Sequence, residues 1–412
     1  MIRYLWFAFF CLAGGSSSAQ HIATLEVELS RPANGLSIPA VIDLDPITFI
    51  ADSALSLLEV KNGRSVPIPF QIEQGPNRRL HWMVNTDQAA SGKAVFELVK
   101  KRPGAFAEIQ AIAKDGELTI RNGEHPLLQY VFKTAYPPEG IDTAYKKSGF
   151  IHPLWSPHGQ VLTRIQAPDH YHHYGIWDPW THVLYKGDTV DFWNLKDRKG
   201  TVRFAKFASI TSGAVFAEYQ TIHEHVAFKK GGGEEVAMNE LQTVRVYKPR
   251  DHDDYYIFDL TIQLNCATEE PVLLLAYRYG GLGWRATPEW NKDNSEVLTS
   301  EGKARKEADG SKARWCIVQG AVGGDYAGAA MLSYPGNYNY PEPLRVWPDN
   351  SNGRGDMYAN FSPTKDMDWP LKPGQNYVLR YRWLVFNGHL SKDRAESAWQ
   401  YFSAPPGVTV KK

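Results

Sequence analysis

The chain has 412 residues, and its 45 Lys and Arg side chains balance its 45 Asp and Glu side chains. Hydrophobic residues make up 43% and charged residues 22%, which is typical of a folded globular protein and excludes a disordered or fibrous chain. No basic block occurs, and a nucleic-acid partner needs clustered positive charge, so nucleic acid is excluded as the main partner. The length exceeds that of one typical domain, and we expect two.

The first 19 residues have the pattern of a signal peptide. Arg3 supplies the positive charge, Tyr4 to Ala13 form a short apolar run, and Ser17-Ser18-Ala19 fit a small-residue cleavage site. The apolar run is too short for a bilayer about 30 Å thick, and no later segment is long and apolar enough. We therefore expect an exported protein, periplasmic or secreted, without membrane insertion after cleavage.

Two cysteines, Cys266 and Cys316, follow this leader. In an oxidising compartment they could form one disulfide, provided that their Cα atoms lie within about 7 Å. They are far apart and form no CxxC pair, which argues against a zinc–cysteine site.

Most of the remaining chain predicts β-structure. Runs rich in β-branched and aromatic residues, separated by Gly, Pro and Asn, predict antiparallel strands. The clearest are AVFELV, ELTIRNG, LLQYVFKTAY, YYIFDLTIQL and YVLRYRWLVF. The one helix that we predict runs from about Ser391, its N-cap, to Phe402, and Pro405-Pro406 follow its end. No βα alternation occurs, so we predict an all-β fold with a large antiparallel β-sandwich.

A change of pattern near residues 113–123 divides the strands into two sets. We therefore predict a small N-terminal β domain over residues 20–115. A large sandwich over residues 116–412 is expected to carry the functional site.

Histidine is concentrated in one stretch, since six of the 13 histidines lie between His152 and His182. The centre of this stretch is APDHYHHYGIWDPW, where Pro168, Gly175 and Pro179 predict a loop or tight turns rather than a strand. Trp can stack on a sugar ring, Asp and His can bond its hydroxyls, and His can transfer protons near neutral pH. The stretch therefore predicts a sugar site.

Within this stretch we predict His173 as a catalytic group. The predicted substrate-binding residues are His170, His172, Trp177, Asp178 and Trp180. The alternative is a structural loop whose histidines bond backbone groups. A metal site is less favoured, because adjacent His172 and His173 do not easily face one ion from an extended backbone.

The segment GAVFAEYQTIHEHVAF predicts one strand of period two. Tyr219, Thr221, His223 and His225 then share a face. His223 and His225 could join a sugar-binding face, or they could belong to a polar side that faces solvent.

The segment YRYGGLGWRATPEW supplies further candidates. Its glycines predict a bend where backbone approaches a ligand closely. Arg285 suits a carboxylate or a vicinal diol, and Tyr279 could act as an acid or base, so both are predicted as catalytic. Trp284 and Glu289 are predicted to bind substrate, although an aromatic core strand with a Gly turn is the alternative. Further on, Glu301 could be a second catalytic carboxylate, and KARKEADGSKAR predicts an exposed charged hairpin.

A series of motifs occurs in a fixed order between about His125 and Gly388. In chain order they are IHPLWSPHGQVLT, PDHYHHYGIW, VDFWN, YRYGGLGWR, TSEGK, ARWCIVQG and PGNYNYPEPLRVW. This series resembles an exported bacterial family of unknown function labelled PmoA or "methane oxygenase". The resemblance implies a β-sandwich organised like carbohydrate-active lyases and mutarotases, preceded by a small β domain. It implies no methane chemistry, because a membrane oxygenase subunit needs several membrane-spanning helices.

The positions that match the family's motifs are His170, His172, His173, Trp284, Arg285 and Glu301. Members usually carry Arg after the paired histidines, where this chain has Tyr174. If that Arg binds a carboxylate, the substrate of this chain differs.

We favour an enzyme that cleaves or eliminates a glycosidic linkage in plant or algal type oligosaccharides. In a lyase, Arg285 or a divalent metal would neutralise a uronate, and His173 or Tyr279 would take the proton. In a hydrolase, two carboxylates flank the bond roughly 5–10 Å apart, with Asp178 and Glu289 or Glu301 as candidates.

Two alternatives stay open. One is a non-catalytic glycan-binding protein. The other is a mutarotase-like epimerase that uses His223 or His225 with Glu301. No cofactor is predicted, and the question of a divalent metal stays open.

Overall fold

The computed structural model describes residues 20–86 and 92–412, so the predicted signal peptide lies outside the described residues. The described chain is all-β, as predicted, and its paired strands run antiparallel. The described helical elements are η1 (Asp52–Ala54), η3 (Thr143–Tyr145), η4 (Leu195–Asp197), α1 (Arg305–Ala308) and α2 (Lys392–Ser403).

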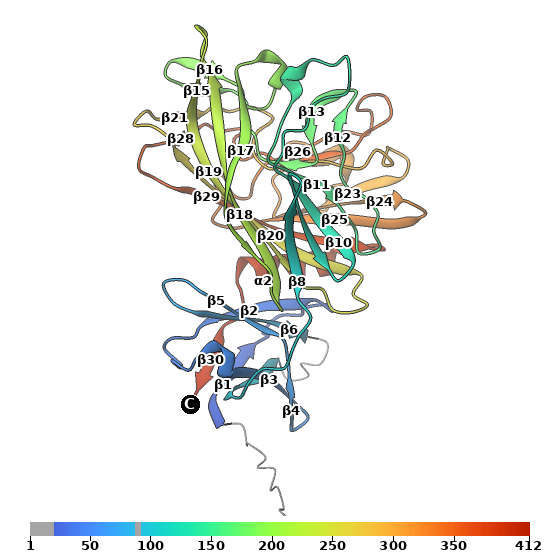
Figure 1. Ribbon diagram of the computed structural model, residues 1–412. Coiled ribbons are helices and arrows are strands. Elements are labelled where there is room, and N and C mark those ends of the chain that lie inside the picture. The colour runs from blue at the N-terminus through green and yellow to red at the C-terminus, as the bar shows by residue number, and fades with distance from the viewer. Residues whose placement is uncertain (1–19, 87–91) are drawn as a thin grey trace, which may run out of the picture.

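Two eight-stranded sheets form the large sandwich (Figure 1). The first, in spatial order, is β17 (Gly200–Thr211), β18 (Phe216–Phe228), β19 (Glu234–Tyr247), β20 (Tyr255–Cys266), β29 (Tyr377–Asn387), β25 (Asp325–Ser333), β24 (Trp315–Val322) and β23 (Ser295–Thr299). The second is β26 (Leu344–Val346), β27 (Tyr358–Phe361), β22 (Gly283–Arg285), β14 (Ile176–Trp177), β11 (Phe150–Leu154), β10 (His125–Val131), β9 (Glu117–Asn122) and β8 (Ile109–Lys114).

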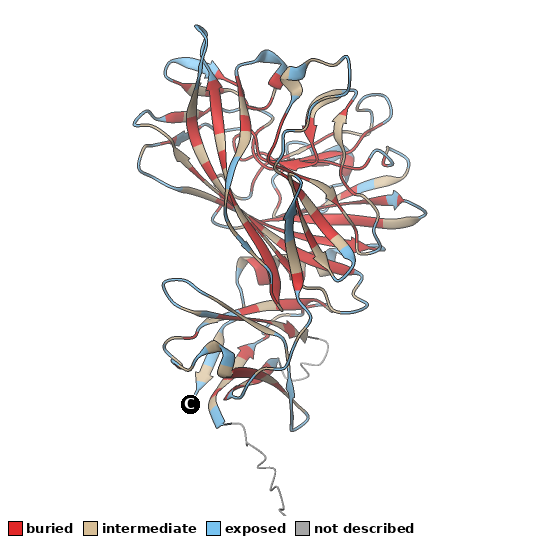
Figure 2. Cartoon of the chain, in the orientation of Figure 1, coloured by how far each residue is buried: buried red, intermediate tan, exposed pale blue. Residues whose placement is uncertain are grey.

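Two smaller sheets extend the sandwich. One consists of β16 (Asp188–Val190), β15 (Val183–Tyr185), β21 (Val272–Leu274) and β28 (Trp369–Leu371). The other is a hairpin of β12 (Ile165–Ala167) and β13 (His170–Tyr174). Buried residues run along the strands of the sandwich, whereas its loops are mostly exposed (Figure 2).

The N-terminal strands form two further sheets below the sandwich in Figure 1. One is β30 (Val408–Lys411), β1 (Gln20–Glu28), β7 (Lys93–Lys100), β3 (Leu55–Lys61) and β4 (Arg64–Pro67); the other is β2 (Ser37–Asp43), β6 (Arg79–Asn85) and β5 (Phe70–Glu73). The C-terminal β30 thus pairs with β1, outside the sandwich. The domain boundary near residue 115 stays a prediction.

The helix predicted near the C-terminus is confirmed as α2. The side chain of Ser391 caps it by accepting the backbone N–H of Arg394 at 3.2 Å. The predicted face of β18 is also confirmed, because His223 and His225 are buried while their chain neighbours Ile222 and Glu224 are half-buried. The alternative of a solvent-facing histidine side is therefore wrong.

Two local predictions are wrong. The sequence DHYHHYG is not a loop, because His170–Tyr174 form strand β13, which pairs with β12. The residues of positive φ in this hairpin, Gln166 and Gly175, lie outside β13. KARKEADGSKAR is not an exposed hairpin, since it contains the one-turn helix α1, in which Arg305 and Ala308 are buried. Arg305 is drawn inward because its guanidinium donates to the carbonyls of Trp347, Gly355 and Asp356.

Cys266 and Cys316 are both free thiols. Within the described ranges, no helix has the length and apolar character needed to cross a membrane.

Candidate functional site

The β12–β13 hairpin packs its histidines against a group of aromatic side chains. The ring of His173 lies 4.7 Å from the rings of both His170 and His172. On its other sides it lies 5.1 Å from Trp177 and 5.2 Å from Tyr358. We call this group the hairpin site, and it consists of His170, His172, His173, Trp177, Trp193, Tyr279, Arg285, Trp347 and Tyr358.

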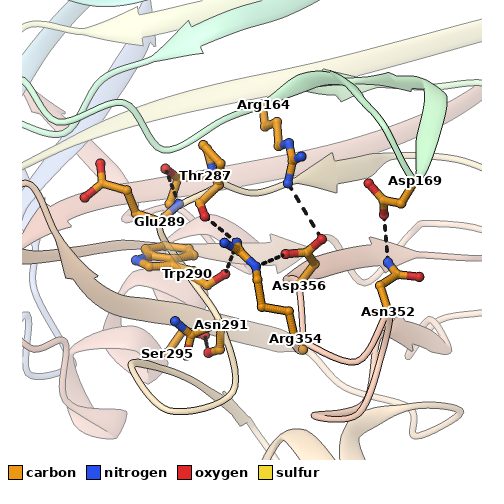
Figure 3. Close-up of polar contacts among 12 residues, drawn as sticks. Arg164, Asp169, Thr287, Glu289, Trp290, Asn291, Ser295, Asn352, Arg354 and Asp356 are labelled. Atoms are coloured by element: carbon orange, nitrogen blue, oxygen red, sulfur yellow. Dashed lines mark hydrogen bonds and ion pairs between the residues drawn. The ribbon is translucent and has the colours of Figure 1, made fainter.

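Arg285 on β22 is fully buried and connects the hairpin to the sandwich. Its Nη2 donates to both carboxylate oxygens of Asp169, at 2.8 and 3.0 Å, and to Asp356 at 2.9 Å. Asn352 also donates to Asp169 at 2.7 Å, and Arg354 donates to the second oxygen of Asp356 at 2.8 Å (Figure 3). These carboxylates are therefore occupied by donors.

The charge state of Asp169 follows from these contacts. Burial alone would raise its pKa, but the hydrogen bond with His170 and the charge of Arg285 hold the pKa well below its usual range. Asp169 is therefore ionised near neutral pH.

His173 is 1% exposed, and burial lowers its pKa well below the usual value, with the charges of His172 and Arg285 adding to the effect. Burial likewise lowers the pKa of His172 to about 3. Both imidazoles are therefore neutral near pH 7, and the buried Nδ1 of His173 has no hydrogen-bond partner among the described residues.

Two tyrosines close the hairpin site. The hydroxyl of Tyr279 accepts hydrogen bonds from Arg345 at 3.1 Å and from Nε1 of Trp347 at 3.0 Å. The hydroxyl of Tyr358 is buried and has no partner within the described structure, and burial raises its pKa well above the usual value. A side chain at Gly283 would place its Cβ 2.7 Å from this hydroxyl, so glycine is required there.

A third buried atom in the same network lacks a partner in the described ranges, namely Nη1 of Arg285, whose guanidinium lies 4.5 Å from the Trp347 ring. The hairpin site thus contains a cationic donor, a neutral imidazole and a phenol whose bonding capacity is unused. Buried polar groups are usually satisfied, so these three groups make the hairpin site a candidate functional site.

The other predicted histidines lie elsewhere, between the two large sheets. His223 and His225 bond the two oxygens of the fully buried Glu240, at 3.0 and 2.8 Å. His223 also bonds the hydroxyl of Tyr130 on the opposite sheet at 2.6 Å.

The same interior holds two more ionisable groups. Nζ of Lys147 donates to the carbonyl of Val202 at 3.1 Å, and neither carboxylate oxygen of Asp178 has a hydrogen-bond partner among the described residues. Burial raises the pKa of Asp178 well above its usual value, and the charge of Glu240 adds to this. We call Lys147, Asp178, His223, His225 and Glu240 the interior cluster.

Four predicted residues join neither group. Trp180 and Trp284 are fully buried in the main hydrophobic core, where Nε1 of Trp284 donates to the carbonyl of Leu162. Glu301 is exposed beside Arg314, at 3.8 Å. Glu289 is also exposed, and it accepts the backbone N–H of Gly323 at 2.8 Å. In Figure 3 its carboxylate points away from Asp356.

A family model matches residues 117–400, which is more than half of the chain, and its description is "Family of unknown function (DUF6807)". The chain belongs to the DUF6807 family. The matched range contains the hairpin site and the interior cluster. The match does not confirm the PmoA label that the motif series suggested, and no curated protein matches the chain.

Solved structures with a similar fold include two from Enterococcus faecalis. An α-mannosidase of strain V583 shows 8% identity and a TM-score of 0.46, covering 96% of this chain and 47% of the mannosidase. A protein in the glycosyl hydrolase family 38 shows 9% identity and a TM-score of 0.43, covering 96% of this chain and 49% of its own. The DUF6807 protein thus spans about half the length of these two proteins.

A mutant of the heparan sulfate lyase HepC from Pedobacter heparinus shows 9% identity and a TM-score of 0.36, covering 71% of this chain and 38% of the lyase. At such low identities and TM-scores, these likenesses carry no argument about the activity of the DUF6807 protein.

Several members of the hairpin site were missed in the sequence. Trp347 is the last residue of the motif PGNYNYPEPLRVW, and Tyr358 follows eleven residues later, but nothing in their spacing indicates that they meet His173. Asp356, which bonds Arg285 from outside the hairpin site, lies in a Gly-rich turn sequence without a signal of its own. Across residues 20–86 and 92–412, no group of three or more His, Cys, Asp or Glu side chains is arranged to hold a metal ion.

Proposed function

We propose that this DUF6807 protein is a glycan lyase that acts on a uronate-containing oligosaccharide at the hairpin site. The observation that carries the proposal is the buried Nη1 of Arg285, which has no partner in the described structure, in the same contact network as the neutral His173. We further propose that the protein acts after export, as its first 19 residues suggest.

Arg285 is suited to bind the uronate carboxylate. Its Nη2 already holds Asp169 and Asp356, which fixes the guanidinium, and Nη1 is left to donate. A charge-assisted hydrogen bond to the carboxylate would stabilise the negative charge that develops beside it when the adjacent proton leaves.

We assign His173 as the group that takes this proton, because its neutral imidazole has a free acceptor nitrogen. Burial and the charge of Arg285 lower its pKa, and the negative charge of a bound uronate would offset the effect of Arg285. In the elimination, the C5–H bond breaks and its proton moves to His173. The electron pair forms the C4=C5 double bond as the C4–O bond breaks. Tyr279 then gives its proton to the leaving oxygen, since two N–H donors already fix the oxygen of its hydroxyl.

Hydrolysis is less well supported by this geometry, because it needs two carboxylates free to act on either side of the bond. Asp169 and Asp356 are both bonded to arginines, and Glu289 and Glu301 lie outside the hairpin site.

The test uses the chain from Gln20 with a panel of uronate-containing and neutral oligosaccharides, with and without a chelator. We expect a rise in near-ultraviolet absorbance, from the new double bond, with uronate substrates. The His173→Gln and Tyr279→Phe variants should lower the rate about 10²- to 10⁴-fold, because each loses a proton-transfer group. Tyr326→Phe is the matched control, since it removes a phenol that bonds Glu296 far from the hairpin site.

Cleavage detected by mass spectrometry without a rise in absorbance would show that the reaction is hydrolysis rather than elimination. Binding without turnover on any substrate would indicate a glycan-binding protein. Full activity of both the His173→Gln and Tyr279→Phe variants would contradict the assignment of the hairpin site as the active site.

A further inference from the structure

A cleft of about 600 Å³ lies next to η3. It is formed by the segment around η3, the end of η4, the start of β17 and the turn between β18 and β19. The ionisable side chains that line it are Lys146, Lys147, Arg198, Arg203, Lys229 and Glu234, which are five cations and one acid. We call it the basic cleft. Such an excess of one sign of charge in a concave surface attracts anions.

The cations of the basic cleft are not all neutralised in the same way. Arg198 pairs with Asp142 at 2.7 Å, and Arg203 pairs with Glu224 at 2.8 Å and with Glu234 at 2.7 Å. Lys229 shares Glu235, at 3.7 Å, with Lys186, which lies 2.7 Å from it. Lys147, by contrast, is 4% exposed and forms no ion pair with another described residue; its Nζ donates only to the carbonyl of Val202. Burial lowers its pKa to about 8, although the charges of Glu240 and Asp178 in the interior cluster act in the opposite direction.

The basic cleft and the hairpin site share a wall. The ring of Tyr145 lies 5.6 Å from that of Tyr171 and 6.4 Å from that of His172, and its carbonyl accepts the hydroxyl of Tyr174. Its chain neighbours Ala144 and Lys146 line the basic cleft. The hairpin of β12 and β13 lies at the end of the sandwich away from the N-terminal sheets (Figure 1).

We propose that the basic cleft binds a second acidic group of the same glycan whose uronate occupies the hairpin site. The substrate is then an oligosaccharide with carboxylates or sulfates on successive sugars rather than a single uronate. This inference rests on the proposed function. Two anion subsites on one ligand raise affinity because the second contact becomes intramolecular.

The test measures calorimetric binding of oligogalacturonates, alginate oligosaccharides and heparin oligosaccharides of increasing length, with neutral oligosaccharides of the same lengths as controls. We expect affinity to rise with length in at least one acidic series and to weaken with salt. The Lys146→Ala/Lys229→Ala variant should bind the long chains about 3- to 20-fold more weakly and the shortest binding chain unchanged. Lys206→Ala, an exposed charge on β17 outside the cleft, is the matched control and should change nothing.

Lys147→Met removes the buried charge and should weaken long-chain binding at least as much, with its thermal unfolding measured to verify the fold. The two exposed lysines keep the test decisive if this variant does not fold. Carboxylate and sulfate are distinguished by which acidic series responds to the variants.

Two results overturn the inference, and they differ. In the first result, Arg285→Lys weakens the binding of acidic chains, but neither chain length nor the lysine variants change it. This would contradict binding at the basic cleft and would still support the hairpin site. If no acidic chain binds at all, the proposed function fails with it.

Discussion

At the scale of single residues, buried acids decide how the stability of this protein depends on pH. Glu342 is fully buried, and its carboxylate accepts hydrogen bonds from Ser333, from Asn337 at 2.8 Å and from Tyr381 at 2.7 Å. Burial nevertheless outweighs these bonds and raises its pKa to about 7 from an ordinary value of 4.5. The folded protein therefore binds an extra proton between these two values.

Because the folded state holds this proton and the unfolded state does not, the contribution of Glu342 is fully present below pH 4.5 and is lost as pH rises through about 7. Glu342→Gln cannot ionise and can keep three hydrogen bonds. We expect its free energy of unfolding to rise relative to the unsubstituted protein by up to about 3 kcal/mol between pH 4 and pH 8. Denaturant titrations at both pH values measure this, and an unchanged difference would contradict it.

Asp178 differs from Glu342, because its carboxyl is buried without a hydrogen-bond partner among the described residues. Asp178→Leu has the same branched shape and removes both unsatisfied oxygens. We expect it to raise the free energy of unfolding by about 1–3 kcal/mol, because an unsatisfied buried group costs about that much. Asp178→Asn keeps two polar atoms and should gain less. If the Leu variant is less stable, Asp178 is bonded in solution by water or ligand.

At the scale of elements, a strand and its buried face could be predicted from the sequence where the period-two pattern of a strand continued through the segment. β18 alternates buried and half-buried residues between Tyr219 and His225, so its histidine face could be predicted from the sequence. The short strand β13 is bounded by turn residues, and these led to the wrong prediction of a loop. Motif membership also could not separate Trp177, which meets His173, from Trp180 and Trp284, which fill the core. Such assignments need the pairing of distant strands, here β14 with β22 and β22 with β27.

The hairpin of β12 and β13 forms a sheet of its own, so its attachment to the sandwich depends on side-chain contacts. Asp169 at its tip accepts hydrogen bonds from Arg285 and Asn352. Asp169→Ala removes these, and we expect faster amide hydrogen exchange over residues 165–174, with exchange in β9 and β10 unchanged. Asp188→Ala, an exposed acid on β16, is the control. Equal exchange in both variants would show that aromatic packing alone holds the hairpin.

At the scale of the whole molecule, one hydrophobic cluster joins the N-terminal sheets to the sandwich. It contains Leu25 and Trp82 from the N-terminal sheets, Phe216 and Ile317 from the large sheet and Tyr401 from α2. Because the cluster crosses between the two parts, we expect them to unfold together. The pairing of β30 with β1 returns the end of the chain to the N-terminal sheet and adds to this coupling.

Phe216 offers a test of this coupling, since its ring lies 5.2 Å from that of His81 in the N-terminal sheet and 3.9 Å from the guanidinium of Arg245 in the sandwich. Phe216→Ala should cost about 3–5 kcal/mol and broaden or split the calorimetric transition, because it removes packing between the two parts. Phe258→Ala deletes an equally buried ring that stacks on Trp383 inside the sandwich. The Phe258→Ala control should be destabilised by a similar amount and should keep a single calorimetric transition. Two transitions in the unsubstituted protein would contradict the coupling of the two parts.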